Sequence, residues 1–234
     1  MTSNPEANAL RAKAQAVYER LLGAFGLPDW TAPLDPLSEL VSTILSQNTN
    51  DRNRDLAFTR LRAAFSTWEA VRDADPVAVI ETIRPAGLAN QKGPRIQAVL
   101  KQITSETGGL DLNFLRDVPA PEALAWLQRF KGVGPKTASI VLQFSLGMPA
   151  FPVDTHVYRV SGRIGLRPER MTVEQAHVHL ASLFAPEQYG IGHLNLIYLG
   201  RRICHARKPD CLACPVQDLC DFFHANWPAA ANRA

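Results

Sequence analysis

Cysteine is absent from most of this chain. Only four cysteines occur among its 234 residues, and all four lie between positions 204 and 220. Disulfide frameworks belong mainly to short secreted chains, whose hydrophobic cores are too small to stand alone. The first residues are polar, and no apolar run reaches the length that spans a bilayer. We therefore expect a protein of a reducing cytoplasm that does not enter a membrane.

A strong charge bias and alternating strand patterns are also missing. The formal net charge is +3 and the sequence pI is about 8.8, a balance that permits nucleic-acid binding without requiring it. Apolar residues recur instead at three- and four-residue spacings, which predicts an all-α protein. The Pro-rich link 27–36 and the turn 147–149 are the expected boundaries between lobes. Helices are expected at residues 9–25, 36–45, 52–65, 76–83, 91–106, 121–128, 136–144, 155–164, 172–184 and 192–203.

The four cysteines are spaced as Cys204-x6-Cys211-x2-Cys214-x5-Cys220. Such crowding predicts one metal centre with four thiolate ligands, which either zinc or a [4Fe–4S] cluster accepts. Zinc sites usually contain two short cysteine pairs or a combination of Cys with His, whereas only one C-x2-C occurs here. The spacing therefore favours iron–sulfur, with zinc and a pair of disulfides as the alternatives.

A glycine-containing turn separates two apolar helical segments near the middle of the chain. The first segment ends at Phe130, the turn reads Gly132-Val133-Gly134, and Lys136 follows at the start of the second segment. Glycine permits backbone conformations and close approaches that other residues resist, and the amides that open a helix suit a phosphate. The pattern predicts a hairpin that contacts the DNA backbone without reading its sequence. A plain interhelical turn is the alternative, because a lone Gly-x-Gly is a weak signal.

Lys136 is followed eighteen residues later by Asp154, at the start of the next expected helix. Each residue alone has an ordinary explanation, since most lysines are solvated and an Asp before a helix is often its N-cap. Together, a lysine on a DNA-facing hairpin and an acid at the entry to the next lobe form a candidate catalytic pair. An ordinary lysine has a pKa near 10.4, so only about one part in a thousand is neutral near pH 7. A carboxylate that accepts its proton would help it act as a nucleophile.

Three motifs, in this order, resemble the endonuclease III family of DNA glycosylases: the hairpin 132–138, the segment 153–156 and the cysteine loop 204–220. The resemblance covers about residues 37 to 220. It implies an all-α, two-lobed helix–hairpin–helix DNA glycosylase fold with an iron–sulfur cluster loop. Residues 37–148 would form a six-helix bundle that ends in the hairpin. Residues 1–36 and 149–234 would form the other domain and hold a [4Fe–4S] cluster on the four cysteines.

The same resemblance implies a base-excision-repair enzyme that binds damaged double-stranded DNA as a monomer. Such an enzyme removes oxidised pyrimidines and nicks the strand by β-elimination through a lysine Schiff base. Lys136 is the implied nucleophile and Asp154 its acidic partner. Asn48 aligns with the loop that fills the gap left by an extruded base, and Leu88 aligns with the wedge into the opposite strand. Further DNA contacts are expected from Gly132, Val133, Gly134, Thr137, His156 and Arg201.

The chain departs from the family pattern at three positions. Pro135 stands where a basic residue commonly precedes the catalytic lysine, and Lys131 stands where a Pro usually precedes the first hairpin glycine. We expect these two changes to alter DNA affinity more than chemistry. Asn48 replaces the Gln typical of bacterial members, which leaves the opposite-base contacts and the lesion preference open.

Three other classes of protein share some of these motifs. A DNA-binding or redox-sensing iron–sulfur protein would need neither Lys136 nor Asp154 and would bind DNA without cutting it. The mismatch adenine glycosylase shares the hairpin, the acid and the cysteine loop, but lacks the lysine and carries a further C-terminal domain. A glycosylase for uracil or thymine mismatches on the same scaffold is the alternative that the sequence separates least well.

Overall fold

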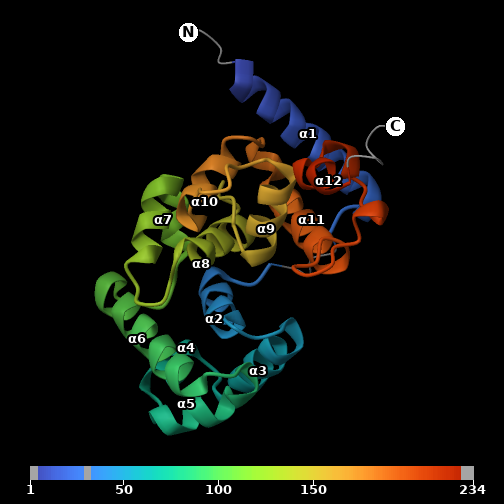
Figure 1. Cartoon of the computed structure of the whole chain (residues 1–234). Helices are drawn as coiled ribbons and strands as arrows, with labels where there is room; N and C mark the ends of the chain where they lie inside the picture. The colour runs from blue at the N-terminus through green and yellow to red at the C-terminus, as the bar shows by residue number, and fades with distance from the viewer. Residues whose placement is uncertain (1–4, 29–32, 228–234) are drawn as a thin grey trace. The chain divides into compact units, whose positions relative to one another are not determined.

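The chain is built from helices. The computed structural model describes residues 5–28 and 33–227, and no β-strand occurs within those ranges (Figure 1). The predicted all-α class is therefore confirmed. The helices of the described ranges include none that is both long and apolar enough to cross a membrane.

The chain forms two compact units. One, here called the hairpin unit, is Ala32–Met148, and the other, the cysteine unit, combines Met1–Thr31 with Pro149–Ala234. The hairpin unit includes residues before position 37, the boundary expected from the sequence. Asp35 is the reason, because its carboxylate caps the first helix of this unit. It accepts hydrogen bonds from the backbone N–H groups of Leu37 and Ser38, at 3.2 and 3.0 Å.

The described residues of the hairpin unit form seven α-helices and three helical turns. In chain order its elements are α2 (Pro36–Ser46), α3 (Asp51–Ala64), α4 (Trp68–Asp73), α5 (Pro76–Thr82), the 3₁₀ turn η1 (Arg84–Ala86), α6 (Ala89–Thr107), the 3₁₀ turn η2 (Asn113–Asp117), α7 (Ala120–Gln128), α8 (Pro135–Ile140) and the π-helical turn η3 (Val141–Leu146).

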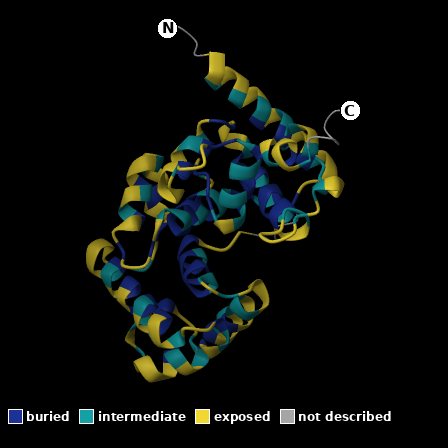
Figure 2. Ribbon diagram, in the orientation of Figure 1, coloured by how far each residue is buried: buried dark blue, intermediate teal, exposed yellow. Residues whose placement is uncertain are grey.

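Helix α2 is the centre of the hairpin unit. Its residues from Pro36 to Leu45 are all buried except Glu39, and Figure 2 shows buried residues along most of it. Helices α3, α6 and α8 and the turn η3 pack against α2. A helix that is buried all round has to be apolar all round, which the segment Leu40–Leu45 very nearly is. The loop that follows α2 is therefore attached to a buried helix, although Asn48 in that loop is exposed.

The predicted hairpin joins α7 to α8. Gly132 has φ +89°, a left-handed conformation that favours glycine. Val133 is 4% exposed, so its side chain fixes the turn to the core, and its N–H donates to the carbonyl of Phe130 at 2.9 Å. Pro135 occupies the first position of α8, where the missing N–H leaves no helical hydrogen bond unmade.

The cysteine unit is arranged around helix α11. Helices α1 and α9 both pack against α11, and Gly200 allows the close approach of α9. A Cβ atom at Gly200 would lie 2.9 Å from the Cβ of His156. In chain order the elements are α1 (Pro5–Phe25), α9 (Thr155–Ile164), α10 (Val173–Ala181), the 3₁₀ turn η4 (Pro186–Gln188), α11 (Tyr189–Arg202), the 3₁₀ turns η5 (Cys211–Ala213) and η6 (Gln217–Leu219), and α12 (Asp221–Asn226).

Two short helices were not expected from the sequence. Helices α4 and α12 each span six residues, which is too short for an apolar period to repeat. They form because each buries aromatic or apolar side chains, Trp68 and Val71 in α4 and Phe223 in α12. The expected helix 136–144 is divided in the structure, because α8 ends at Ile140 and continues as the π-helical turn η3.

The guanidinium of Arg116 satisfies the end of η3 by donating to the carbonyls of Ser145, at 2.7 Å, and Leu146.

Replacing Gly132 with alanine should lower the free energy of unfolding by about 2 kcal/mol, because a left-handed alanine is strained. The new Cβ would also collide with Cδ of Arg95. Chemical denaturation of Gly132→Ala measures this loss. Gly134→Ala is the matched control, because Gly134 has φ −91° and a Cβ added there would meet no atom within 4 Å. Equal stability losses in the two variants would contradict the assigned turn geometry.

Candidate active site and metal centre

Lys136 lies half-buried in the first turn of α8, directly after the hairpin. Because α8 packs against α2, the lysine comes near Glu39, a carboxylate that no sequence motif indicated. Burial raises the pKa of Glu39, while a hydrogen bond from the Thr43 hydroxyl and the charges of Arg54 and Lys136 oppose that rise. The Thr43 hydroxyl donates to Oε1 of Glu39 at 3.3 Å. The hairpin lysine thus has an acidic neighbour within its own unit.

The start of α8 offers backbone rather than side-chain groups to a ligand. Gly134 caps the helix without a side-chain hydrogen bond, and Pro135 has no N–H. The side chain of Thr137 is buried, at 4% exposure, as is that of Val133. Any contact of these residues with DNA would therefore use the main chain, as expected for phosphate binding at a helix start.

Asn48 and Leu88 both lie exposed in short loops of the hairpin unit and both have a left-handed backbone. Their φ angles are +52° and +49°, values that are uncommon outside glycine and that often mark functional positions. Leu88 is 47% exposed although it is a large apolar residue. The structure thus presents an amide and an apolar side chain from two strained loops.

Gln47 links the Asn48 loop to the hairpin. Its Nε2 donates to the carbonyl of Gly132 at 3.0 Å, and its Oε1 accepts a hydrogen bond from Nη1 of Arg95 at 2.8 Å. The sequence motifs identified the loop but not this residue as its connection. A polar residue at the end of an otherwise apolar helix was the available signal, and many solvated residues share it.

Asp154 lies in the cysteine unit, at the start of α9. Its Oδ1 accepts a hydrogen bond from the backbone N–H of Val157 at 2.7 Å, so the N-cap role considered from the sequence is real. The same helix carries His156, whose Nδ1 lies 3.1 Å from Nη2 of Arg159. Arg201 is exposed in the last turn of α11. A capping Asp can still act in chemistry, because the cap uses one of its two oxygens.

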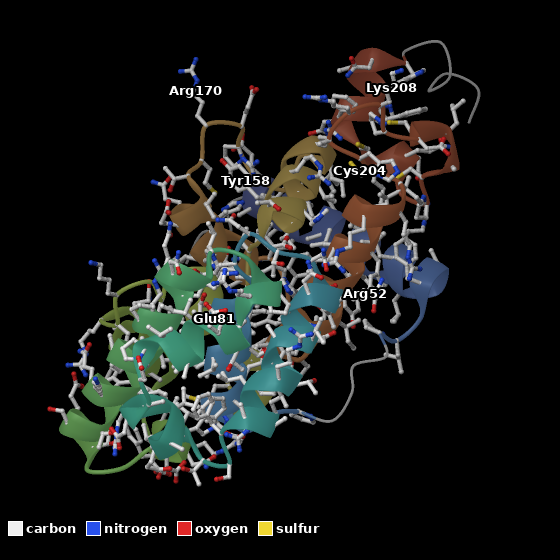
Figure 3. All side chains as sticks on the ribbon, turned by 90° about the horizontal axis from the view of Figure 1, so that it is seen from below. Arg52, Glu81, Tyr158, Arg170, Cys204 and Lys208 are labelled. Carbon is white, nitrogen blue, oxygen red and sulfur yellow. The ribbon has the colours of Figure 1, made fainter. Side chains whose placement is uncertain are left out.

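The four cysteines are free thiols, so the two-disulfide alternative is wrong. All four line one pocket, together with the apolar side chains of Ile164, Leu199 and Phe223. Figure 3 shows sulfur atoms, drawn yellow, close to the labelled Cys204. Within the described ranges no three Cys, His, Asp or Glu side chains converge closely enough to hold one metal ion.

The surroundings of these thiols suit a cofactor that binds thiolates. Burial raises the pKa of Cys214 to about 11 and also raises those of Cys211 and Cys220. These three bare thiols are therefore protonated at neutral pH, and a metal has to displace their protons. Arg163 supplies compensating positive charge, with its Nη1 3.4 Å from Sγ of Cys204. These residues fit a [4Fe–4S] cluster.

Arginine side chains tie the cysteine loop to the rest of its unit. Nη2 of Arg159 donates to the carbonyls of Gly200 and Cys204, at 2.9 and 3.0 Å, so α9 and the loop are joined one turn after Asp154. Arg20, from α1, donates to Asp218 at 3.0 Å and to the carbonyl of Pro215. These residues were not predicted from the sequence, because arginines that bind distant carbonyls have no characteristic spacing.

The fold and these two sites define a helix–hairpin–helix protein with a C-terminal iron–sulfur loop. Residues 41–186 match the family of HhH-GPD superfamily base excision DNA repair proteins, and residues 204–220 match the iron–sulfur binding domain of endonuclease III. The chain belongs to the HhH-GPD superfamily and, within it, to the endonuclease III family. The predicted family and cofactor are thereby confirmed.

Individual relatives agree with this assignment. A putative DNA glycosylase of Arabidopsis thaliana is 38% identical over 72% of this chain, which spans 57% of that longer protein. Endonuclease III of Thermotoga maritima is 33% identical, with 81% of this chain and 84% of that protein aligned. A non-covalent endonuclease III–DNA complex superimposes with a TM-score of 0.80 at 26% identity, covering 93% of this chain and 98% of that one. A trapped endonuclease III–DNA covalent intermediate gives 0.78 at 25% identity, covering 92% and 97%.

Replacing Cys214 with serine should remove the cluster. The wild-type protein is expected to contain about four iron and four sulfide per chain, with visible charge-transfer absorbance. Cys214→Ser should lose most of both and unfold more readily, because metal binding and folding are coupled. Leu212→Ser is the control, since Leu212 lies in the same loop and is 69% exposed. Stoichiometric zinc without iron, after anaerobic purification, would contradict the assignment.

Proposed function

We propose that this chain removes oxidised pyrimidines from duplex DNA and then cleaves the strand by β-elimination. Membership of the endonuclease III family makes it a DNA glycosylase with AP lyase activity, and the class of lesion is the further step. Pyrimidines that have lost aromaticity stack poorly, which lowers the cost of extruding them from the helix. The observation that carries the proposal is the lysine in the first turn after the hairpin, beside amides suited to a phosphate.

Lys136 is the nucleophile in this proposal. Its neutral amine attacks C1′ of the deoxyribose, the bond from C1′ to the base breaks, and the base leaves with a proton. Ring opening gives a Schiff base between Nζ and C1′, and loss of a C2′ proton then expels the 3′ phosphate. The position of Lys136 at a helix start favours its neutral form, and the nearby Glu39 carboxylate favours the ammonium. The covalent endonuclease III–DNA complex among the structural neighbours agrees with a covalent mechanism.

Asp154 supplies the second group. It accepts a proton from Lys136, directly or through water, and stabilises the positive charge that develops on the sugar as the base departs. Its cap geometry supports this role, because the hydrogen bond from Val157 fixes the carboxylate at the start of α9 while occupying one oxygen only. The carboxylate is thus oriented before substrate binds.

Asn48 and Leu88 act on the duplex rather than on the sugar. Leu88 inserts between bases as an apolar wedge, and the Asn48 loop fills the space that the extruded nucleotide leaves. Their exposure and left-handed backbones support these roles. Gly132, Val133, Gly134 and Thr137 hold a phosphate through their main chain, and His156 and Arg201 contact the backbone from the cysteine unit. The enzyme works as a cytoplasmic monomer, a setting in which its four thiols stay reduced and available to the cluster.

Borohydride trapping tests the nucleophile. With duplex DNA that contains thymine glycol or an abasic site, the wild-type protein should form a covalent adduct, because borohydride reduces the Schiff base. Lys136→Ala should form none. Lys131→Ala is the matched control, since Lys131 is an exposed lysine of the same hairpin and should retain the adduct. Trapping by Lys136→Ala, or base excision by it at the wild-type rate, would refute this mechanism.

Two substitutions separate the chemical role of Asp154 from its capping role. Asn caps helices about as well as Asp, so Asp154→Asn should keep the stability of the protein but lower the single-turnover rate on the order of 100-fold or more. Asp154→Ala should lose a further ~1 kcal/mol in the free energy of unfolding. Substrate affinity should change little in Asp154→Asn. A wild-type rate in Asp154→Asn would leave only the capping role.

A further inference from the structure

Lys92 is a buried cation in the first turns of α6. It is 1% exposed, although lysine is among the residues least often buried. No carboxylate within the described ranges forms a salt bridge with it. Burial, and then the charge of Arg95, lowers the pKa of Lys92 to about 8, so the side chain is still mostly charged at neutral pH. Burying an unpaired charge is unfavourable unless other groups solvate it.

Two backbone carbonyls solvate the buried ammonium group of Lys92. Nζ of Lys92 donates to the carbonyl of Leu45 at 2.8 Å and to that of Ala86 at 2.7 Å. Leu45 lies in the last turn of α2, where carbonyls lack helical partners and the helix dipole attracts a cation. Ala86 is the last residue of η1. One ammonium group therefore joins the ends of two elements that are far apart in the sequence.

Each of these carbonyls comes shortly before a strained, exposed residue. Leu45 is followed by the loop that carries Asn48, and Ala86 is followed by Gly87 and Leu88. Asn48 and Leu88 are two of the three non-glycine residues with positive φ in the described ranges, the third being Lys208 in the cysteine unit. The buried ammonium thus lies at the shared base of the two loops.

We propose that Lys92 is a positioning residue that holds the Asn48 loop and Leu88 in a fixed relation, so that the wedge and the gap-filling loop enter the duplex together. This inference rests on the roles proposed above for those two loops. Lys92 itself touches neither substrate nor the reacting atoms, since it is enclosed by protein. Its function is to make the extrusion of a paired base efficient.

A second link from α6 supports this assignment. Arg95 lies one turn after Lys92 and donates to Gln47, whose amide in turn binds the hairpin carbonyl of Gly132. Lys92 and Arg95 of α6 therefore connect Leu88, the Asn48 loop and the hairpin of Lys136. A rigid connection of this kind keeps groups in the productive geometry before DNA binds, which is the usual requirement for a functional site.

The test compares a substrate that needs extrusion with one that does not. Lys92→Met fills a similar volume but donates no hydrogen bonds. Its excision of thymine glycol from duplex DNA in single turnover should fall on the order of 100-fold, the scale expected when a site loses its alignment. Borohydride trapping at an abasic site in single-stranded DNA should stay within about threefold of wild type, because nothing has to be extruded there. Lys92→Arg should restore part of the duplex activity.

Gln97→Leu is the matched control. Gln97 lies in α6, is 4% exposed, and donates from Nε2 to the carbonyls of Val71 and Ala74 at 3.0 and 2.8 Å. Its replacement removes a buried bridge to carbonyls that belong to neither loop, and should leave the ratio of duplex to single-stranded activity unchanged. If Lys92→Met does not fold at the assay temperature, Lys92→Gln, which keeps an amide donor on a shorter chain, should show the same selective loss.

Two results would overturn the inference. One is an equal loss on both substrates in a folded Lys92 variant, which would mean a general structural role. The other is wild-type activity of a folded Lys92→Met variant on both substrates, which would mean that the buried ammonium has no role in extrusion. Failure of the proposed function is distinguishable, because the wild-type protein itself would then not excise thymine glycol from duplex DNA, whatever the Lys92 variants do.

Discussion

The burial of α2 is the constraint on which the hairpin unit depends. Helix α2 is surrounded by α3, α6, α8 and η3 and has only Glu39 and Ser46 outside its buried residues, and densely packed interiors resist displacement. Side chains and loops that are joined to α2 are therefore held in fixed positions. Glu39 stays beside Lys136, the carbonyl of Leu45 meets Lys92, and Gln47 reaches the hairpin. One buried segment therefore fixes the relative positions of Lys136, the Asn48 loop and the hairpin.

The Gly-x-Gly turn predicted the hairpin, the cysteine spacing predicted the metal loop, and the apolar periodicity predicted the long helices, because each has a local signature. The periodicity could not predict α4 and α12, which are shorter than two apolar periods and depend on tertiary burial. Because lysine is usually exposed to solvent, no feature of the sequence indicated that Lys92 is buried. Glu39 interrupts an apolar helix, yet only the packing of α8 on α2 explains which cation it meets. The missed residues are those whose partners come from distant parts of the chain.

The same geometry explains the three departures from the family pattern. Asn48 has φ +52°, a region in which Asn is several-fold enriched and longer side chains are rare, so Asn suits this backbone. Pro135 occupies the first position of α8, where its fixed φ suits the start of a helix. Lys131 is exposed in the turn, so it adds positive charge beside the hairpin without disturbing the core. Each departure is compatible with the local backbone, and the second and third change the charge near Lys136 in opposite directions.

The strained loops also bear on how the enzyme uses binding energy. Extruding a paired base costs a few kcal/mol, and a left-handed Leu88 costs about 1–2 kcal/mol relative to an ordinary backbone. That strain is present before any substrate arrives, because the buried core and the Lys92 ammonium hold the loop during folding. Binding therefore does not have to supply the free energy of this strained backbone. The free energy of contacts with DNA is then available for opening the duplex. A poorly stacked, damaged base costs less to extrude than an intact one, so it leaves a smaller barrier for those contacts to overcome.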